Sequence, residues 1–134
     1  LWRDPDVRLV QVCREDEAVA VCSGLLAMGK QAAVLVQNTG LMNAVDALRG
    51  LPIYNRQAML LLVGYRGYRE MEGAPGWGDN AAQYTEPLLH ALGITTFLVR
   101  GAADVGRISE AQAAARQASH PAVVLIVPEE TEGP

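Results

Sequence analysis

The fold is decided by the stretch from Arg14 to Asn43, which reads REDEAVAVCSGLLAMGKQAAVLVQNTGLMN. It opens with three consecutive acids, which favour the positive end of a helix dipole. Small apolar residues at helical spacing follow, so we expect a closely packed helix over 15–28, ended by Gly29. The apolar run 32–36 then predicts a strand buried on both faces, and a Gln-Asn-Thr-Gly turn opens a second helix over 39–48, ended by Gly50 and Pro52.

The rest of the chain repeats this alternation of strands and helices. Further strands are predicted at 8–13, 58–63, 95–99 and 122–127, and further helices at 81–92 and 109–118, the last capped by Ser109. Alternation of this kind gives parallel strands joined by right-handed crossovers. We therefore predict an α/β fold with a three-layer, doubly wound parallel sheet.

The 134 residues are enough for one domain with its own core, and we expect 1–134 to form it. The chain starts at Leu1 without an initiator methionine, so some N-terminal residues are expected to be missing, and 129–134 reads as a frayed acidic tail. A glycine-rich loop over 68–80 is long enough to be a lid.

Composition limits the possible partners and compartments. The formal charge of −4 and the lack of a basic cluster argue against nucleic acid and anionic membranes as partners. Apolar runs are only as long as strands, so a cytoplasmic protein is expected. Cys13 and Cys22 have no cysteine or histidine partner at ligand spacing, so we interpret both as buried thiols in a reducing compartment, and we predict no metal site in this chain.

Three segments that end predicted strands should meet at one edge of the sheet. They are 13–15, 37–40 and 64–67, and ligands of doubly wound sheets bind at this carboxyl edge. No Gly-x-Gly-x-x-Gly, Walker or nucleophile-elbow motif occurs. The sequence therefore predicts a polar ligand site without the anchors of a nucleotide-binding protein or a hydrolase.

Within the acidic triplet, Glu15 is the candidate catalytic residue. Asp16 and Glu17 are explained as a solvated helix start. Glu15 is open to the same explanation, but it stands at the mouth of a tightly packed helix, where a carboxylate could take part in proton exchange.

The order and spacing of these residues resemble a known family. Glu15, Ala18, Gly24, Gly29-Lys30, the strand into Gln37-Asn38-Thr39-Gly40, and the later Gly64-Tyr65-Arg66-Gly67 are similar to the pyrimidine-binding domain of thiamine-diphosphate-dependent decarboxylases. Within that family the likeness is greatest to the alpha subunit of sulfopyruvate decarboxylase and to the matching half of phosphonopyruvate decarboxylase. It covers roughly residues 13–94, and Tyr65 stands where the family usually has tryptophan.

The resemblance implies a division of labour between two chains. Glu15 would hydrogen-bond N1′ of the aminopyrimidine of thiamine diphosphate, and Gln37, Asn38 and Thr39 would also contact the cofactor. A separate beta subunit would bind the diphosphate and Mg²⁺, because Gly78-Asp79-Asn80 lacks the second glycine of the family's Gly-Asp-Gly motif. The expected assembly is a hetero-oligomer such as α2β2 or larger.

The substrate implied by the resemblance is a small anionic 2-oxo acid. Arg66, Gln37 and Asn38 are the candidate substrate-binding residues, since the planar guanidinium of arginine can bind two oxygens of an anion at once. Decarboxylation of sulfopyruvate to sulfoacetaldehyde and CO₂ is the first expectation, and phosphonopyruvate or another 3-substituted 2-oxo acid is the second. A non-catalytic binding or scaffold module with the same fold is the third.

Overall fold

The structure is a computed structural model that describes residues 4–74 and 78–128. The strands are β1 (Ala33–Gln37), β2 (Leu60–Gly64), β3 (Thr95–Val99) and β4 (Ala122–Ile126). The α-helices are α1 (Glu15–Ala27), α2 (Asn38–Asn43), α3 (Val45–Leu48), α4 (Tyr68–Met71), α5 (Ala81–Ala91) and α6 (Gly106–Ala118). A π-helical turn, η1 (Arg49–Ile53), follows α3, and a 3₁₀ turn, η2 (Ala102–Asp104), precedes α6.

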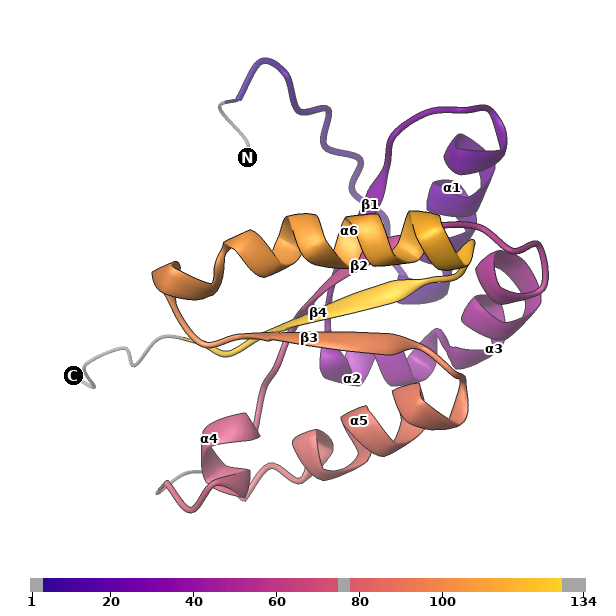
Figure 1. Cartoon of the computed structure of the whole chain (residues 1–134). Coiled ribbons are helices and arrows are strands. Elements are labelled where there is room, and N and C mark those ends of the chain that lie inside the picture. The colour runs from indigo at the N-terminus through magenta and orange to yellow at the C-terminus, as the bar shows by residue number, and fades with distance from the viewer. Residues whose placement is uncertain (1–3, 75–77, 129–134) are drawn as a thin grey trace.

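The four strands form one parallel sheet in the order β1-β2-β4-β3. Figure 1 shows α6 lying across one face of the sheet, while α2 and α5 lie on the other. The contacts agree, because α6 packs on β3 and β4, α2 on β1 and β2, and α5 on β3. The predicted three-layer α/β fold is confirmed.

The strands β2, β3 and β4 supply side chains to two separate cores, one on each face of the sheet. Val34, Leu61 and Leu125 point into the larger core under α1, α2 and α5, whereas Leu60 and Val124 join the smaller core under α6. Strands covered on both faces need apolar residues at every position, which explains the unbroken apolar runs of β2 and β4.

The predicted strand at 8–13 is wrong. These residues carry no strand, and Leu9 and Val10 are exposed. A short segment rich in apolar residues forms a strand only where a neighbouring strand provides hydrogen bonds and a face to cover. The sheet therefore has four strands in the described residues, not five.

Several helix boundaries also differ from the prediction. The helix expected over 39–48 is two short helices that meet at Ala44, and helical turns continue through Pro52 as η1. The last helix begins at Gly106, so Ser109 lies inside it and is not its cap. The 68–80 loop contains the one-turn helix α4, and the acidic tail 129–134 lies outside the described residues.

One flank of the sheet beside α6 remains open. Leu35, Val36, Leu62 and Ile126 line a shallow apolar groove there, and Leu35 is 54% exposed. Among residues 4–74 and 78–128, no helix is both long and apolar enough to cross a membrane.

Candidate functional site

The carboxyl edge of the sheet brings together the three segments that the sequence singled out. The turn 37–40 follows β1 directly, because Gln37 ends the strand and Asn38 begins α2. Arg66 follows β2, and its backbone carbonyl accepts a hydrogen bond from Asn38. Glu15 begins α1 and lies against Gly40. The turn 37–40 is therefore in contact with both of the other segments.

The first turn of α1 separates its acids by function. The Asp16 carboxylate pairs with the Arg14 guanidinium through two hydrogen bonds, at 2.9 and 3.1 Å, which lower the pKa of the Asp16 carboxyl and raise that of Arg14. The Glu17 carboxylate turns back to accept hydrogen bonds from the backbone N–H groups of Cys13 and Arg14. Both therefore stabilise the helix start, as predicted.

Glu15 differs from both of its neighbours. It is half-buried, and its carboxylate has no hydrogen-bond or ion-pair partner among the described residues. The side chain lies directly over the α-carbon of Gly40, in the buried first turn of α2. A carboxylate held against the protein with its oxygens unengaged is available to a ligand.

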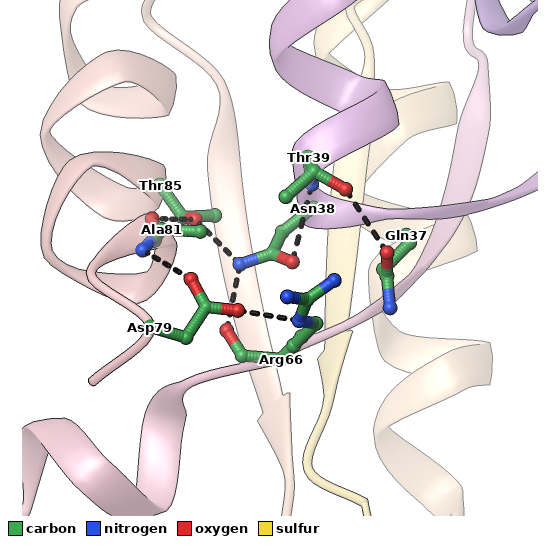
Figure 2. Close-up of polar contacts among 7 residues, drawn as sticks. All are labelled: Gln37, Asn38, Thr39, Arg66, Asp79, Ala81 and Thr85. Atoms are coloured by element: carbon green, nitrogen blue, oxygen red, sulfur yellow. Dashed lines mark hydrogen bonds and ion pairs between the residues drawn. The ribbon is translucent and has the colours of Figure 1, made fainter. Parts of the chain in front are cut away.

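Asn38 connects three elements at the centre of this edge (Figure 2). Its side chain is fully buried, and the amide donates to the Arg66 carbonyl at 2.9 Å and to Thr85 Oγ1 at 3.1 Å. Its Oδ1 accepts from the backbone N–H of Thr39 at 3.1 Å. Thr85, on α5, donates in turn to the Ala81 carbonyl. Both amide protons of Asn38 are thus engaged, which makes its side chain a bracket inside the fold and leaves direct ligand contact to its neighbours.

Gln37 and Thr39 flank this bracket on the outer side. The Thr39 hydroxyl donates to Gln37 Oε1 at 3.0 Å, and Gln37 is exposed (Figure 2). The amide Nε2 of Gln37 makes no hydrogen bond within the described residues. A ligand at this edge could therefore receive a hydrogen bond from Gln37.

Arg66 forms an ion pair through Nε with Asp79 (Figure 2). Its side chain is 57% exposed, whereas that of Asp79 is only 13% exposed. Asp79 Oδ1 accepts from the backbone N–H of Ala81 at 2.9 Å, so the same carboxylate also holds the start of α5. The partner at Nε fixes the guanidinium plane, and within the described part of the chain the two Nη groups carry no hydrogen bond. Such a fork can meet an anion.

A buried aromatic cluster supports the backbone on both sides of Arg66. The Tyr65 and Tyr68 ring centroids lie 4.9 Å apart, and the Tyr65 hydroxyl donates to Glu86 at 2.8 Å. Burial, reinforced by this hydrogen bond, raises the pKa of the Tyr65 phenol, which therefore stays neutral. The Tyr68 hydroxyl donates to Glu72 at 2.8 Å, and Arg100 lies over the Tyr68 ring. These contacts fix the backbone that presents Arg66.

Glycine at position 67 is required on two grounds. Its φ of +79° lies in the left-handed region, and a β-carbon there would approach the Asp79 carbonyl oxygen to 2.9 Å. This close approach sets Asp79 beside Arg66.

Sequence reasoning did not identify Asp79 or Thr85 as parts of the site, and it gave Gly40, within the predicted 37–40 segment, no role of its own. Asp79 stands two residues before a helix start, which is a usual place for a capping carboxylate. Thr85 carries no sequence signal, and the contact of Gly40 with Glu15 could not be predicted, because both depend on neighbours distant along the chain.

The two cysteines are not alike. Cys22 is buried, as predicted, but Cys13 is exposed, because the segment that contains it is not a strand of the sheet. Within residues 4–74 and 78–128, no three His, Cys, Asp or Glu side chains are grouped to hold a metal ion.

Curated relatives of this chain share one activity in their names. The alpha subunit of sulfopyruvate decarboxylase from Methanococcus maripaludis is 30% identical over 94 residues, which are 70% of this chain and 55% of that one. The subunit of the same name from Methanothermobacter thermautotrophicus is 38% identical over 64 residues, 48% of this chain and 39% of that one. The sulfopyruvate decarboxylase of Methanosarcina acetivorans is 33% identical over 67 residues, 49% of this chain and 16% of that one.

The matched regions span about half the length of these relatives, or less. No family model matches the chain.

Proposed function

The chain is a homologue of sulfopyruvate decarboxylase alpha subunits, and from this premise we propose that it is the pyrimidine-binding subunit of a thiamine-diphosphate-dependent 2-oxo-acid decarboxylase. Sulfopyruvate is the proposed substrate, with sulfoacetaldehyde and CO₂ as products. The proposal treats 1–134 as one pyrimidine-binding domain.

The observation that carries the proposal is the state of Glu15. Of three consecutive acids at the start of α1, two are engaged in stabilising the helix, and Glu15 alone has no partner among the described residues. It lies at the carboxyl edge of a parallel sheet, where ligands of this architecture bind. A half-buried carboxylate with unengaged oxygens fits a ligand that offers a ring nitrogen.

The residues present fit the aminopyrimidine half of thiamine diphosphate. Glu15 would hydrogen-bond the N1′ atom and hold or release a proton there. Gln37 and Thr39 would meet the ring from the exposed side of the turn, and Asn38 would act by fixing their backbone. The cofactor supplies the electron sink for decarboxylation, and the protein supplies position and electrostatics.

Arg66 would bind the sulfonate of the substrate. Its Nη groups are unengaged within the described residues, and Asp79 orients the guanidinium through Nε. Sulfonate and phosphonate both present three oxygens to such a fork, so the names of the relatives, and not Arg66, favour sulfopyruvate.

The remaining parts of the site are assigned to a partner. Asp79, the acid of the incomplete Gly78-Asp79-Asn80 motif, is committed to Arg66 and to the start of α5. We therefore assign the diphosphate and Mg²⁺ to a beta subunit, in a hetero-oligomer whose sites lie between chains.

The experiment reconstitutes the chain with a diphosphate-binding subunit, thiamine diphosphate and Mg²⁺, and measures CO₂ release from sulfopyruvate. The complex should turn over, and the Glu15→Gln variant should lose activity by about 100-fold or more, because an amide cannot exchange the proton that general acid–base catalysis requires. Asp16→Asn is the matched control, since Asp16 pairs only with Arg14 and the helix start.

Two results would overturn the proposal. One is full activity of the Glu15→Gln complex, which would favour a non-catalytic scaffold role. The other is robust turnover by the isolated chain, which would contradict the division between two subunits. Rates on phosphonopyruvate, measured with the same complex, identify the preferred substrate.

A further inference from the structure

Gly40 makes an unusually close approach to one side chain. A β-carbon built on its backbone would lie 2.4 Å from Cγ of Glu15, 2.6 Å from Oε1 and 2.7 Å from Cδ. These are the three nearest heavy atoms, and all belong to Glu15. Real β-carbons essentially never come closer than 3.0 Å to another atom. Any residue with a β-carbon at position 40 would therefore require Glu15 to move.

The backbone does not itself require glycine at this position. Gly40 lies inside α2, and its φ is not in the left-handed region. Glycine is among the least favourable residues in a helix interior, and alanine is the most favourable. The presence of glycine thus weakens a helix of only six residues, so its reason must lie in what packs against it.

We propose that Gly40 is a positioning residue for Glu15: its bare α-carbon is the seat that holds the carboxylate at the carboxyl edge of the sheet. The steric relationship between Gly40 and Glu15 does not depend on the function of the protein. Its catalytic consequence rests on the proposed function, in which Glu15 contacts the aminopyrimidine.

The Gly40→Ala substitution should displace the carboxylate and leave the fold intact. The three nearest atoms belong to a flexible side chain, so Glu15 can rotate or shift by about 1 Å to reach ordinary van der Waals contact with the new β-carbon. A displacement of about 1 Å at a catalytic group can cost about 100-fold in rate.

The first test uses thermal unfolding of the full chain and needs no cofactor. In a Glu15→Ala background the obstructing atoms are gone, so Gly40→Ala should raise Tm by roughly 2–5 °C through helix propensity. In the wild-type background the same change should raise Tm less, or lower it. Gly24→Ala is the matched control, because Gly24 is an exposed helical glycine with open space around it. It should raise Tm equally in both backgrounds.

The second test uses the reconstituted complex. Gly40→Ala should lower kcat by about 10- to 100-fold and weaken thiamine diphosphate binding, while KM for the 2-oxo acid changes less than twofold. In a Glu15→Ala background, Gly40→Ala should cause no further loss, because it acts only through Glu15. Gly24→Ala should leave the rate unchanged.

The outcomes separate this inference from the proposed function. Equal Tm effects of Gly40→Ala in both backgrounds would overturn the steric relationship between Gly40 and Glu15. Coupled Tm effects together with an unchanged kcat of Gly40→Ala, in a complex that Glu15→Gln inactivates, would overturn its catalytic consequence. An active complex that Glu15→Gln leaves unchanged would instead overturn the function proposed for Glu15.

Discussion

The Asn38 side chain, fully buried, donates a 2.9 Å hydrogen bond to the backbone carbonyl of Arg66. This bond ties the turn after β1 to the loop after β2, 28 residues further along the chain. The position of the exposed Arg66 guanidinium thus depends on a residue that solvent does not reach.

Removal of the Asn38 bracket should destabilise the fold. Asn38→Ala leaves the Arg66 carbonyl and the Thr39 N–H without the partner that Asn38 provides, and a buried polar group left unpaired costs roughly 1–3 kcal/mol. We expect a loss of about 2–4 kcal/mol in the free energy of unfolding, measured by urea denaturation. Thr85→Val keeps the shape of the side chain and removes its polar contacts, so its loss should be smaller. A loss below about 0.5 kcal/mol for Asn38→Ala would show that the Asn38 side chain does not stabilise this part of the fold.

Substitutions of Arg66 and Asp79 should change KM for the substrate more than kcat. In the reconstituted complex, Arg66→Ala should raise KM for the anionic substrate by about 10- to 100-fold, as expected for loss of hydrogen bonds to a charged group. Arg66→Lys keeps the charge and loses the fork, so it should recover only part of the affinity.

Asp79→Asn tests the orientation of Arg66 separately. It retains an oxygen that can accept the Ala81 N–H, and removes the charge that pairs with Nε. A modest rise in KM, with the free energy of unfolding nearly unchanged, is the expected result. If Arg66→Ala leaves KM unaltered in steady-state kinetics, then Arg66 is not the substrate-binding group.

Gly67 should tolerate alanine less well than a glycine of similar backbone conformation. Gly29 has a φ of +71°, close to the +79° of Gly67, but has open space around it. Gly29→Ala should therefore report only the cost of a left-handed alanine, about 1 kcal/mol. Gly67→Ala should cost at least about 1 kcal/mol more, because its β-carbon meets the Asp79 carbonyl at 2.9 Å. Chemical denaturation of the two variants checks the difference, and equal losses would contradict the close approach.

The two thiols should differ sharply in reactivity. Cys13 is exposed, whereas Cys22 is 3% exposed and burial raises its pKa to about 11. Since the thiolate is the reactive form, a disulfide reagent at pH 8 should modify one thiol per folded chain, and the second only after denaturation. The rapid phase should disappear in Cys13→Ser and persist in Cys22→Val.

Cys22 also predicts a dependence of stability on alkaline pH. Its folded pKa is raised above the unfolded value of 9.0, so between about pH 9 and pH 11 the unfolded chain has released a proton that the folded chain retains. The stability is fully present below pH 9 and falls as the pH rises through 11, by up to about 2–3 kcal/mol. Unfolding of the wild type and Cys22→Val across this range measures the contribution, and parallel curves would contradict it.

The sequence predicted those elements whose signal is local. The strands predicted at 58–63 and 122–127 were identified, as Leu60–Gly64 and Ala122–Ile126, because a strand buried on both faces needs consecutive apolar residues. The segment 8–13 carries an equally local pattern, yet it has no neighbouring strand to complete it. Pairing depends on the rest of the sheet, which no window of sequence contains.

The same distinction applies to the site. Glu15 and Arg66 became candidates because they stand at a recognisable helix start and after a recognisable strand end. Thr85 and the steric role of Gly40 were not predicted, since Gly40 acts through Glu15 and Thr85 through Asn38. The predicted ligand contacts of Glu15, Gln37, Asn38, Thr39 and Arg66 stay predictions. Because the Asn38 side chain is buried and its amide is engaged, we expect Asn38 to support the site and not to contact the ligand.

The open flank of the sheet beside α6 affects the solubility of the isolated chain. Within the described residues, β1 is hydrogen-bonded to a strand on one side only, and Leu35 faces water from its middle. An exposed edge strand next to an apolar groove favours pairing of the sheets of two copies, and therefore aggregation. The solubility of the purified chain should thus be limited by aggregation of the folded protein, and a charged side chain at position 35 should raise that solubility.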